Sequence, residues 1–442
     1  MTPRLNLETL ASLPAHVRRP DFDFQHLGVG IVHLGLGAFH RAHQAVFTED
    51  ALIAGGGDWG ILGVSLRHAA APAALAAQDQ LYTVETLAST LEYRVMAAIR
   101  ASLCPTTHGA QLEEALASPQ THIVTLTVTE KGYCLGIDGE LDFAHAEISH
   151  DLHHPDQPGS AIGWIARGLA ARHQSHGRPI TVVSCDNLQA NGPRLHRAVS
   201  AFMERSRPDL LSWLKDNVAF PRTVVDCIVP AATDASRARL AQALGLEDTA
   251  GVQREPYSQW VIERHFSGPR PAWDRVGVQI VDDVDAHGRL KLHVLNACHS
   301  ALAYLGLPRG YVFVREAIID ADLARFLTEL VSAEIAPALD PLPVQEYWRT
   351  VRTRFVNPRI DHRLSQISED GSQKLAERIF PLMVANAGTG APIRLLSRIV
   401  RGWLELTYGE AHLRAALDDP RLFPPPIRDN PSLRAAILEA AV

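Results

Sequence analysis

The chain has 442 residues, of which 46% are hydrophobic and 21% charged, and its formal net charge is −7 at pH 7. This composition is that of a globular protein, and the length predicts two or three domains rather than one. The mildly acidic balance gives no electrostatic basis for binding nucleic acid or an anionic membrane surface, and no apolar run reaches the length of a membrane span.

The five cysteines are scattered along the chain without a Cys-x-x-Cys pair, and their number is odd. This usage is typical of reduced thiols, and the first residues lack the charged and then apolar pattern of a secretory signal. We therefore expect a cytoplasmic protein.

The first informative stretch is a glycine turn that follows a short apolar run. After Gly35-x-Gly37, an amphipathic helix is expected over 39–54 and a new strand over 59–66, although His40 replaces the third glycine of the usual fingerprint. This is the order of a dinucleotide-binding unit, in which glycines let the backbone approach a pyrophosphate and a helix N-terminus favours its negative charge. The predicted cofactor-binding residues of this turn are Gly35, Gly37, Ala38 and Phe39.

Further strands are expected over 122–128, 179–185 and 222–226, and polar residues follow the first two. An open α/β sheet holds its ligands at the carboxyl ends of its strands. This position makes five polar residues candidates for a binding site: Glu130, Lys131, Asp186, Asn187 and Asn191.

From about Arg289 onward, helical periodicity dominates the sequence. Helices are expected over 290–305, 320–338, 345–355, 393–408 and 411–417. The change from alternating strands to helices predicts an α/β cofactor-binding domain over 1–285 and an α-helical substrate and catalytic domain over 286–442.

The helical run over 290–305 carries a lysine, an amide and an imidazole in an apolar setting, at Lys291, Asn296 and His299. On an α-helix, positions 296 and 299 lie nearly above one another, whereas 291 and 296 diverge by about 140°. We therefore expect Lys291 at or just before the helix start, reaching the cleft that the other two residues face. Desolvation lowers a lysine pKa toward neutrality, so the group could transfer protons. The alternative is a capping lysine with two polar core residues.

The many histidines invite a metal interpretation, which the spacing does not favour. His40 and His43 are three residues apart, whereas helical zinc ligands are more often four apart with a third ligand nearby. The histidines around 150–154 lie in a Pro- and Asp-rich segment that we expect to be a solvated loop. No metal site is predicted.

Taken together, these motifs resemble the polyol-specific long-chain dehydrogenase/reductase family, the group of mannitol dehydrogenases and fructuronate (mannonate) reductases. The resemblance extends from Gly30 to about Trp403. It rests on the segments 35–44, 129–134, 184–192, 225–226 and 255–260 and on the Lys291, Asn296 and His299 signature.

The resemblance implies an α/β fold, with a Rossmann-type N-terminal domain followed by a mainly α-helical C-terminal domain and the active site between them. It also implies a metal-independent, NAD(P)-dependent oxidation of a secondary alcohol in an open-chain polyol or hexonate. The expected partner is a small sugar acid or polyol, and the chain is expected to be a monomer or a small homo-oligomer.

The same resemblance implies roles for individual residues. Lys291 would be the general acid in reduction and the base in oxidation, while Asn187 and Asn296 would donate hydrogen bonds to the carbonyl oxygen. His299 would orient that oxygen or a neighbouring hydroxyl, and Asp226 would bind a substrate hydroxyl.

Within the family, the segments 159–163, 300–306 and 370–375 look more like fructuronate reductase than mannitol dehydrogenase. A uronate carries a carboxylate, which arginine and lysine bind through charge-assisted hydrogen bonds. Lys374 and Arg363 are the candidates for this role, and a surface ion pair is the alternative for each.

Two positions depart from the family pattern. Many relatives carry a glutamate three residues before the lysine, where this chain has Gly288, so protons would pass through His287 or directly through water. The second strand ends in Ser65-Leu66-Arg67, without the acidic residue that binds a ribose 2′-hydroxyl. NAD is the expected cofactor, but Arg67 would suit the 2′-phosphate of NADP.

Two other functions stay open at this point. A mannitol-, arabinitol- or sorbitol-type polyol 2-dehydrogenase would differ in not requiring a carboxylate on its substrate. A nucleotide-binding protein that has lost its chemistry would have no reason to retain the lysine, both asparagines and the histidine.

Overall fold

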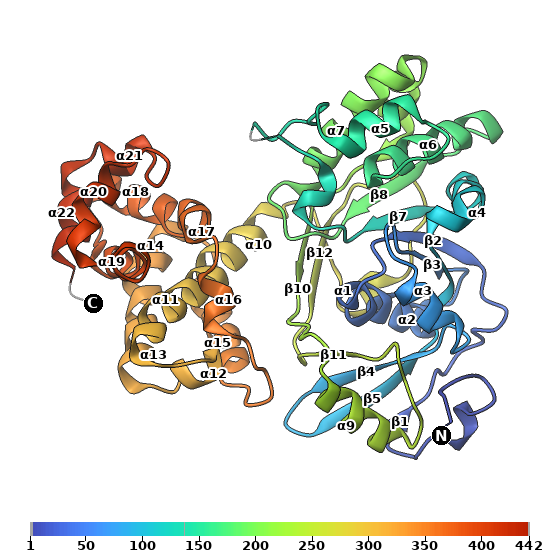
Figure 1. The fold of residues 1–442 in the computed structure, drawn as a ribbon, viewed down its shortest axis with the longest axis horizontal. Helices are drawn as coiled ribbons and strands as arrows, with labels where there is room; N and C mark the ends of the chain where they lie inside the picture. The colour runs from blue at the N-terminus through green and yellow to red at the C-terminus, as the bar shows by residue number, and fades with distance from the viewer. Residues whose placement is uncertain (1–2, 137, 441–442) are drawn as a thin grey trace. The chain divides into compact units, whose positions relative to one another are not determined.

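The computed structural model describes residues 3–136 and 138–440. The chain folds as two compact units, Met1–Val284 and Asp285–Val442 (Figure 1). The first combines sheets with covering helices, and the second is helical.

A six-stranded parallel sheet forms the centre of the first unit. Its spatial order is β6 (Ile99–Leu103), β3 (Gly60–Val64), β2 (Val29–Leu34), β7 (Ile123–Leu126), β8 (Ile180–Ser184) and β9 (Val218–Ala219). This is the strand order of a Rossmann fold, in which the order reverses between the first and fourth strands. The reversal lies between β2 and β7, so a ligand is expected beyond the carboxyl ends of these two strands.

Both faces of this sheet are buried, which explains why its strands are almost continuously apolar. On one face, Val32 and Leu34 pack with α4 (Pro105–Ala117), α6 (Ala161–Ser175) and α7 (Asn191–Ser206). On the other face, Ile31 packs with residues of α2 and of the smaller sheets.

The helical segment after β2 differs from the single amphipathic helix expected over 39–54. It is divided into α1 (Ala38–Ala42) and α2 (Gln44–Gly55) by His43, whose φ of −125° and ψ of −83° are not helical. The expected amphipathicity is wrong, because α2 is buried on most sides. It packs against η4 (Trp273–Val276), where the Trp273 indole donates a 3.2 Å hydrogen bond to the Thr48 hydroxyl.

Two smaller sheets complete the first unit. One contains β1 (Val17–Arg18), β5 (Leu91–Met96), β4 (Tyr82–Leu87) and β11 (Val252–Arg254). The other contains β10 (Thr223–Asp226), β12 (Gln259–Glu263) and β13 (Gln279–Val281). The strand expected over 222–226 is present as β10, but it pairs antiparallel with β12 instead of extending the parallel sheet.

The histidine-rich segment expected as a loop is helical in its first part, because α5 spans Ala146–His153, and it leaves the helix from His154 to Gly159. The Asp151 carboxylate is buried and accepts hydrogen bonds from the backbone N–H groups of Gly159 and Ser160 at 2.7 and 3.0 Å. Asp151 therefore connects α5 to the start of α6. The other helices of this unit are α3 (Ala70–Ala76), α8 (Leu211–Asn217), α9 (Asp234–Leu244) and the short η1 (Leu10–Ser12), η2 (Glu130–Tyr133) and η3 (Pro208–Leu210).

The second unit surrounds a single apolar core to which Val294, Leu302, Leu327, Val351 and Ile399 contribute. Its first helix is built from α10 (Asp285–Leu290), the π-helical η5 (Lys291–Asn296) and α11 (Ala297–Gly306). The helix expected over 320–338 also contains a π-helical segment and consists of α13 (Ala321–Leu330), η7 (Val331–Ile335) and α14 (Ala336–Leu339).

The remaining helices of the second unit include two that the sequence predicted closely, α15 (Val344–Phe355) and α19 (Arg394–Tyr408). Three further helices were not predicted from the sequence: α16 (Leu364–Ser368), α17 (Gly371–Arg378) and α18 (Phe380–Thr389). The unit also contains α12 (Val314–Ala317), α20 (Leu413–Asp418), α21 (Pro425–Arg428), α22 (Pro431–Glu439), η6 (Leu307–Arg309) and η8 (Glu410–His412). Among the described residues, no helix combines the length and apolarity needed to cross a membrane.

Candidate active site

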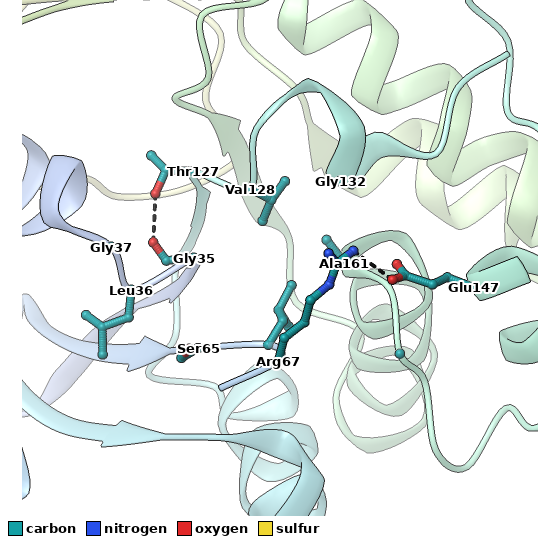
Figure 2. A pocket seen from close by; sticks show the side chains of 12 residues that line it. Gly35, Leu36, Gly37, Ser65, Arg67, Thr127, Val128, Gly132, Glu147 and Ala161 are labelled. Atoms are coloured by element: carbon teal, nitrogen blue, oxygen red, sulfur yellow. Dashed lines mark hydrogen bonds and ion pairs between the residues drawn. The ribbon is translucent and has the colours of Figure 1, made fainter. Parts of the chain in front are cut away.

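A cavity of about 260 Å³ opens at the carboxyl ends of β2, β3 and β7 (Figure 2). It therefore lies at the reversal of the strand order, where Rossmann folds hold their ligands. Three turns contribute most of its lining, and residues near α5 and α6 complete it. The lining residues are Gly35, Leu36, Gly37, Ser65, Leu66, Arg67, Thr127, Val128, Gly132, Glu147, Gly159 and Ala161.

The two glycines of the turn after β2 serve different purposes. Gly35 has a φ of +106°, and a Cβ built there would lie only 2.1 Å from the carbonyl oxygen of Thr127. A side chain at this position would therefore both strain and displace the turn. A Cβ on Gly37 would meet only the Gly35 oxygen, at 3.8 Å, so the space above Gly37 is open to a ligand.

The N–H groups of the turn itself are already engaged within the chain. Gly35 and Leu36 both donate to the carbonyl oxygen of Val64, at 2.8 and 3.0 Å, and Gly37 donates to that of Gly35 at 2.6 Å. The first turn of a helix leaves its N–H groups without intrahelical partners, which points to Ala38 and Phe39 at the start of α1. Neither residue lines the cavity with its side chain, and the Phe39 ring stacks on His43.

His40, which replaces the third glycine, is accommodated by a second buried histidine that the sequence analysis missed. The rings of His33 and His40 stack with centroids 3.3 Å apart and planes 11° apart. His33 bonds to the Thr125 hydroxyl at 2.7 Å and to the Gly35 carbonyl oxygen at 3.0 Å. Burial lowers the pKa of His33 to about 3 and that of His40 well below its usual value. Both rings are thus neutral supports of the glycine turn.

Arg67, which follows β3, forms an ion pair with Glu147 across the cavity. Its guanidinium Nη2 donates to Oε1 of Glu147 at 2.7 Å (Figure 2). The exposed fraction of the side chain is 60% for Arg67 and 30% for Glu147. Glu147 comes from α5, 80 residues further along the chain, and no local sequence signal connects it with Arg67.

Glu130 and Lys131 lie on the exposed turn η2, which follows β7. Asp186 anchors this loop by accepting hydrogen bonds from the N–H of Thr129 at 2.8 Å and the Tyr133 hydroxyl at 2.8 Å. Burial raises the pKa of Asp186, and these bonds oppose the shift. Asp186 is therefore a structural anchor, and neither Glu130 nor Lys131 lines the cavity.

The two asparagines after β8 have different environments. Asn191 is 1% exposed, and its amide donates to the Thr223 hydroxyl at 2.9 Å and accepts from the Thr223 N–H at 3.0 Å. It therefore joins the end of β8 to the start of β10 and is not available to a ligand. Asn187 lies on the same loop and is exposed. Asp226, the last residue of β10, is only 6% exposed.

In the second unit, Lys291 lies inside a continuous helix, so the prediction that it stands at or just before a helix start is wrong. It follows α10 directly and opens the π-helical segment η5, which ends at Asn296. The hydrogen bonds of a π-helix run from i to i+5, so residues five apart come close to the same face. Lys291 and Asn296 therefore share a face of the backbone.

Arg378 of α17 supports this π-helical segment. Its Nη1 donates to the Asn296 carbonyl oxygen at 3.4 Å and to the Ser300 hydroxyl at 3.1 Å. The His293 ring in turn bonds to the Arg378 carbonyl oxygen at 3.0 Å. The wider turn of η5 is thus held by contacts from a helix about 80 residues later, which local periodicity cannot reveal.

His299 is 7% exposed and is surrounded by aromatic rings and cations. Its ring centroid lies 4.5 Å from that of Phe355 and 4.9 Å from that of His362. Its buried Nε2 has no hydrogen-bond partner among the described residues. Burial lowers the pKa of His299 well below its usual value, and the positive charges of Arg354, Arg378 and Lys291 add to this. His299 is therefore a neutral imidazole whose Nε2 is available for a hydrogen bond.

The two expected carboxylate anchors occupy different environments. Lys374 of α17 is half-buried and its Nζ donates to the Ile367 carbonyl oxygen at 3.2 Å. Burial and Arg378 lower the pKa of Lys374, whose charge in turn acts on His362. Arg363 is exposed, with its guanidinium 5.2 Å from the Phe313 ring centroid. Arg354, His362 and Arg378 are not predicted as site residues by the sequence, because only tertiary packing brings them near His299.

Known proteins match the chain over almost all of its length. The model of the mannitol dehydrogenase Rossmann domain matches residues 29–275, and that of the mannitol dehydrogenase C-terminal domain matches 283–434. D-mannonate oxidoreductase of Escherichia coli is 39% identical, covering 94% of this chain and 88% of that protein. Mannitol 2-dehydrogenase of Phaeosphaeria nodorum is 35% identical, covering 95% and 76%.

A solved structure extends the comparison to three dimensions. It is the ternary complex of Pseudomonas fluorescens mannitol 2-dehydrogenase with NAD and D-mannitol, which is 34% identical, covers 99% of this chain and 96% of that one, and superposes with a TM-score of 0.87. With both family domains matched in order and relatives above 30% identity along the whole chain, this protein belongs to the mannitol dehydrogenase family of oxidoreductases.

Proposed function

We propose that this protein is an NAD-dependent oxidoreductase that reduces a keto-sugar acid, D-fructuronate, to D-mannonate and catalyses the reverse oxidation. The observation that carries the proposal is the concentration of cations around the neighbouring rings of His299 and His362. Arg354 and Arg378 act on His299, and Arg354 and Lys374 act on His362. A sugar acid supplies the negative charge that such a group favours, whereas an uncharged polyol does not. The similarity to D-mannonate oxidoreductase of Escherichia coli supports the same substrate class.

The first unit suits a dinucleotide. The open space above Gly37 and the first-turn N–H groups of Ala38 and Phe39 would accommodate the pyrophosphate, with Gly35 shaping the turn. Arg67 follows the second strand, where such folds place the adenosine ribose. We propose Glu130 and Lys131 as further contacts from the loop after β7. When bound, the nicotinamide supplies the hydride in reduction and accepts it in oxidation.

Lys291 is proposed to transfer the proton. In reduction its ammonium donates to the substrate oxygen as the carbonyl becomes an alcohol, and in oxidation the free amine removes the hydroxyl proton. Asn296, on the same face of η5, would donate a hydrogen bond to that oxygen as negative charge develops. Asn187 is proposed to donate a second hydrogen bond to it.

His299 and Asp226 are proposed to orient the substrate. The neutral imidazole of His299 has a buried Nε2 that can accept a hydrogen bond from a substrate hydroxyl or donate one to an oxygen. A carboxylate such as Asp226 can only accept, so it would select a substrate hydroxyl rather than the carbonyl oxygen.

Lys374 is the proposed partner of the substrate carboxylate, and Arg363 is a second candidate. The half-buried position of Lys374 strengthens an ion pair, because the local dielectric is lower than in water. The ring contact of Arg363 with Phe313 leaves its charge intact, but this residue is more exposed. Lys374 is therefore the better candidate.

His287 is proposed to pass protons between Lys291 and solvent. The two residues are four apart, and α10 is α-helical up to Leu290, so they lie nearly one turn apart on one face. His287 would then do the work of the glutamate that many relatives carry at the position of Gly288.

A polyol 2-dehydrogenase is the second candidate function. It is favoured by the similarity to the Pseudomonas fluorescens mannitol 2-dehydrogenase, whose structure contains D-mannitol. Its distinguishing property would be turnover of substrates without a carboxylate.

The test is nicotinamide absorbance with purified protein and NADH, using D-fructuronate, tagaturonate and D-fructose in parallel. Consumption of NADH with a uronate and little with D-fructose would support the sugar-acid reductase. Efficient turnover of D-fructose, or of mannitol in the reverse direction, would favour the polyol dehydrogenase. No turnover with any of these substrates despite nucleotide binding would contradict both proposals.

A further inference from the structure

The bend that follows β3 carries an arginine, Arg67, where NAD-binding Rossmann folds usually carry an acidic residue. A carboxylate at this point accepts a hydrogen bond from the ribose 2′-hydroxyl, and an arginine nearby instead suits the 2′-phosphate of NADP. By its local sequence, this protein would therefore favour NADP.

Tertiary structure adds a carboxylate to the same place. Glu147 lines the cavity together with Arg67, and the two are joined by the 2.7 Å hydrogen bond described above (Figure 2). They are the charged members of the cavity lining. Because both side chains remain partly exposed, the pair is accessible to a ligand in the cavity.

The position of Glu147 is fixed by folded structure rather than by a loose loop. It lies in the first turn of α5. There the ring Nδ1 of the N-cap residue His145 accepts a 3.3 Å hydrogen bond from the backbone N–H of Glu147. The neighbouring Ile148 is fully buried, and Asp151 connects the same helix to α6. Cys134 Sγ lies 3.9 Å from Oε2 of Glu147, and burial raises the pKa of this thiol to about 12, so it stays uncharged beside the carboxylate.

We propose that Glu147 is the residue that makes this protein prefer NAD(H) over NADP(H). Its carboxylate replaces the one missing at the end of β3 and accepts the ribose 2′-hydroxyl. It also occupies the guanidinium of Arg67, which would otherwise pair with a 2′-phosphate, and it repels that phosphate directly. This inference rests on the proposed dinucleotide-binding function of the cavity.

The test is equilibrium binding of NADH and NADPH to the full-length protein in the absence of substrate. Binding is measured by the change in nicotinamide fluorescence. The wild type should bind NADH more tightly. Glu147→Gln keeps the shape of the side chain and removes its charge, so it should shift the ratio of the two Kd values toward NADPH by about tenfold or more. Adding Arg67→Ala to this variant should remove the gain in NADPH affinity.

The matched control is Glu113→Gln. Glu113 pairs with Arg167 at 2.6 Å and is 32% exposed, so it resembles Glu147 in chemistry and burial, but it does not line the cavity. This variant should leave both Kd values unchanged.

The outcomes separate the two proposals. If the wild type binds neither nucleotide, the proposed function fails, and this inference fails with it. If the wild type binds NADH but Glu147→Gln leaves the ratio within about twofold, or if the wild type prefers NADPH, only the role of Glu147 is refuted. Should Glu147→Gln not fold, Arg67→Ala alone decides: it should keep the preference for NADH, and a shift toward NADPH would overturn the inference.

Discussion

Lys291 and Asn296 are the first and last residues of one π-helical segment in a helix that is continuous from Asp285 to Gly306. In an α-helix, residues five apart diverge by about 140°, whereas i to i+5 hydrogen bonding brings them close to one face. A lysine ammonium and a side-chain amide on one face can bind the same oxygen atom. The local change in helix type would therefore let the proposed acid and its neighbouring donor act on the same substrate oxygen.

Replacing Lys291 should mainly affect the chemical step. Lys291→Ala should lower kcat by about 10²- to 10⁴-fold with little change in KM, because the proton donor is lost while the other substrate contacts remain. Steady-state kinetics at neutral pH provides the measurement. Lys215→Ala on the exposed surface of α8 is the control, since it removes an equal charge. Near-normal turnover of Lys291→Ala would show that another group donates the proton.

Replacing Lys374 should reduce affinity for sugar acids selectively. Lys374→Met keeps much of the side-chain length and removes the charge, so KM for D-fructuronate should rise about 10-fold or more, the range of one charge-assisted hydrogen bond. Parallel kinetics with D-fructose, which carries no carboxylate, should show little change. An equal loss with both substrates would instead assign Lys374 a structural role through its bond to Ile367.

The two glycines of the turn after β2 should respond differently to alanine. Gly35→Ala should destabilise the first unit by about 1–3 kcal/mol, because the positive φ and the 2.1 Å approach to Thr127 exclude a Cβ. Gly37→Ala should leave the thermal midpoint unchanged and weaken NADH binding, because its methyl group enters open space. Thermal unfolding and NADH titration of both variants check this contrast, and equal midpoints for the two would refute it.

The buried pair His33 and His40 should make stability depend on pH. Both pKa values are lower in the folded protein than in the unfolded chain, where they are near 6.5, so the unfolded state binds protons more readily. Their contribution is complete above pH 6.5 and falls as the pH drops toward about 3, the folded pKa of His33. Each histidine can cost up to about 1.4 kcal/mol per pH unit in this window.

Urea unfolding of the wild type and of His40→Gln at pH 7 and pH 5 measures this effect. The wild type should lose more stability between the two values than the variant, which cannot titrate at position 40. Parallel losses in the two proteins would mean that other groups dominate the acid sensitivity.

Much of the fold was readable from the sequence because its signals are local. The apolar run before Gly35, the glycine turn and the strand at 59–66 correspond to β2, the turn and β3, since strand and turn preferences act over a few residues. Periodicity likewise revealed α15 and α19. The helix predicted over 39–54 is present as α1 and α2, but its predicted amphipathicity is wrong, because α2 is buried on most sides and has no polar face.

The candidate site was only partly readable. Lys291, Asn296 and His299 are close in sequence and were recognised together. Their relative directions were predicted for an α-helix, however, and the π-helical segment changes them. Asn191 looked like a site residue because it follows a strand, yet its side-chain nitrogen and oxygen are both engaged, by Thr223 and by the Gly192 backbone. A residue type at a strand end does not reveal whether neighbouring backbone already satisfies it.

By itself, the sequence determined the family, the class of chemistry and the order of the two domains, because glycine turns, strand periods and short catalytic motifs are encoded within a few residues. Only the tertiary structure decided what lies opposite those motifs. It placed Glu147 against Arg67, His33 against His40, and Arg378 against the π-helical segment, across separations of 80, 7 and about 80 residues. Charges and hydrogen bonds act through space, so the electrostatic character of each local motif is set by partners that arrive only when the chain folds.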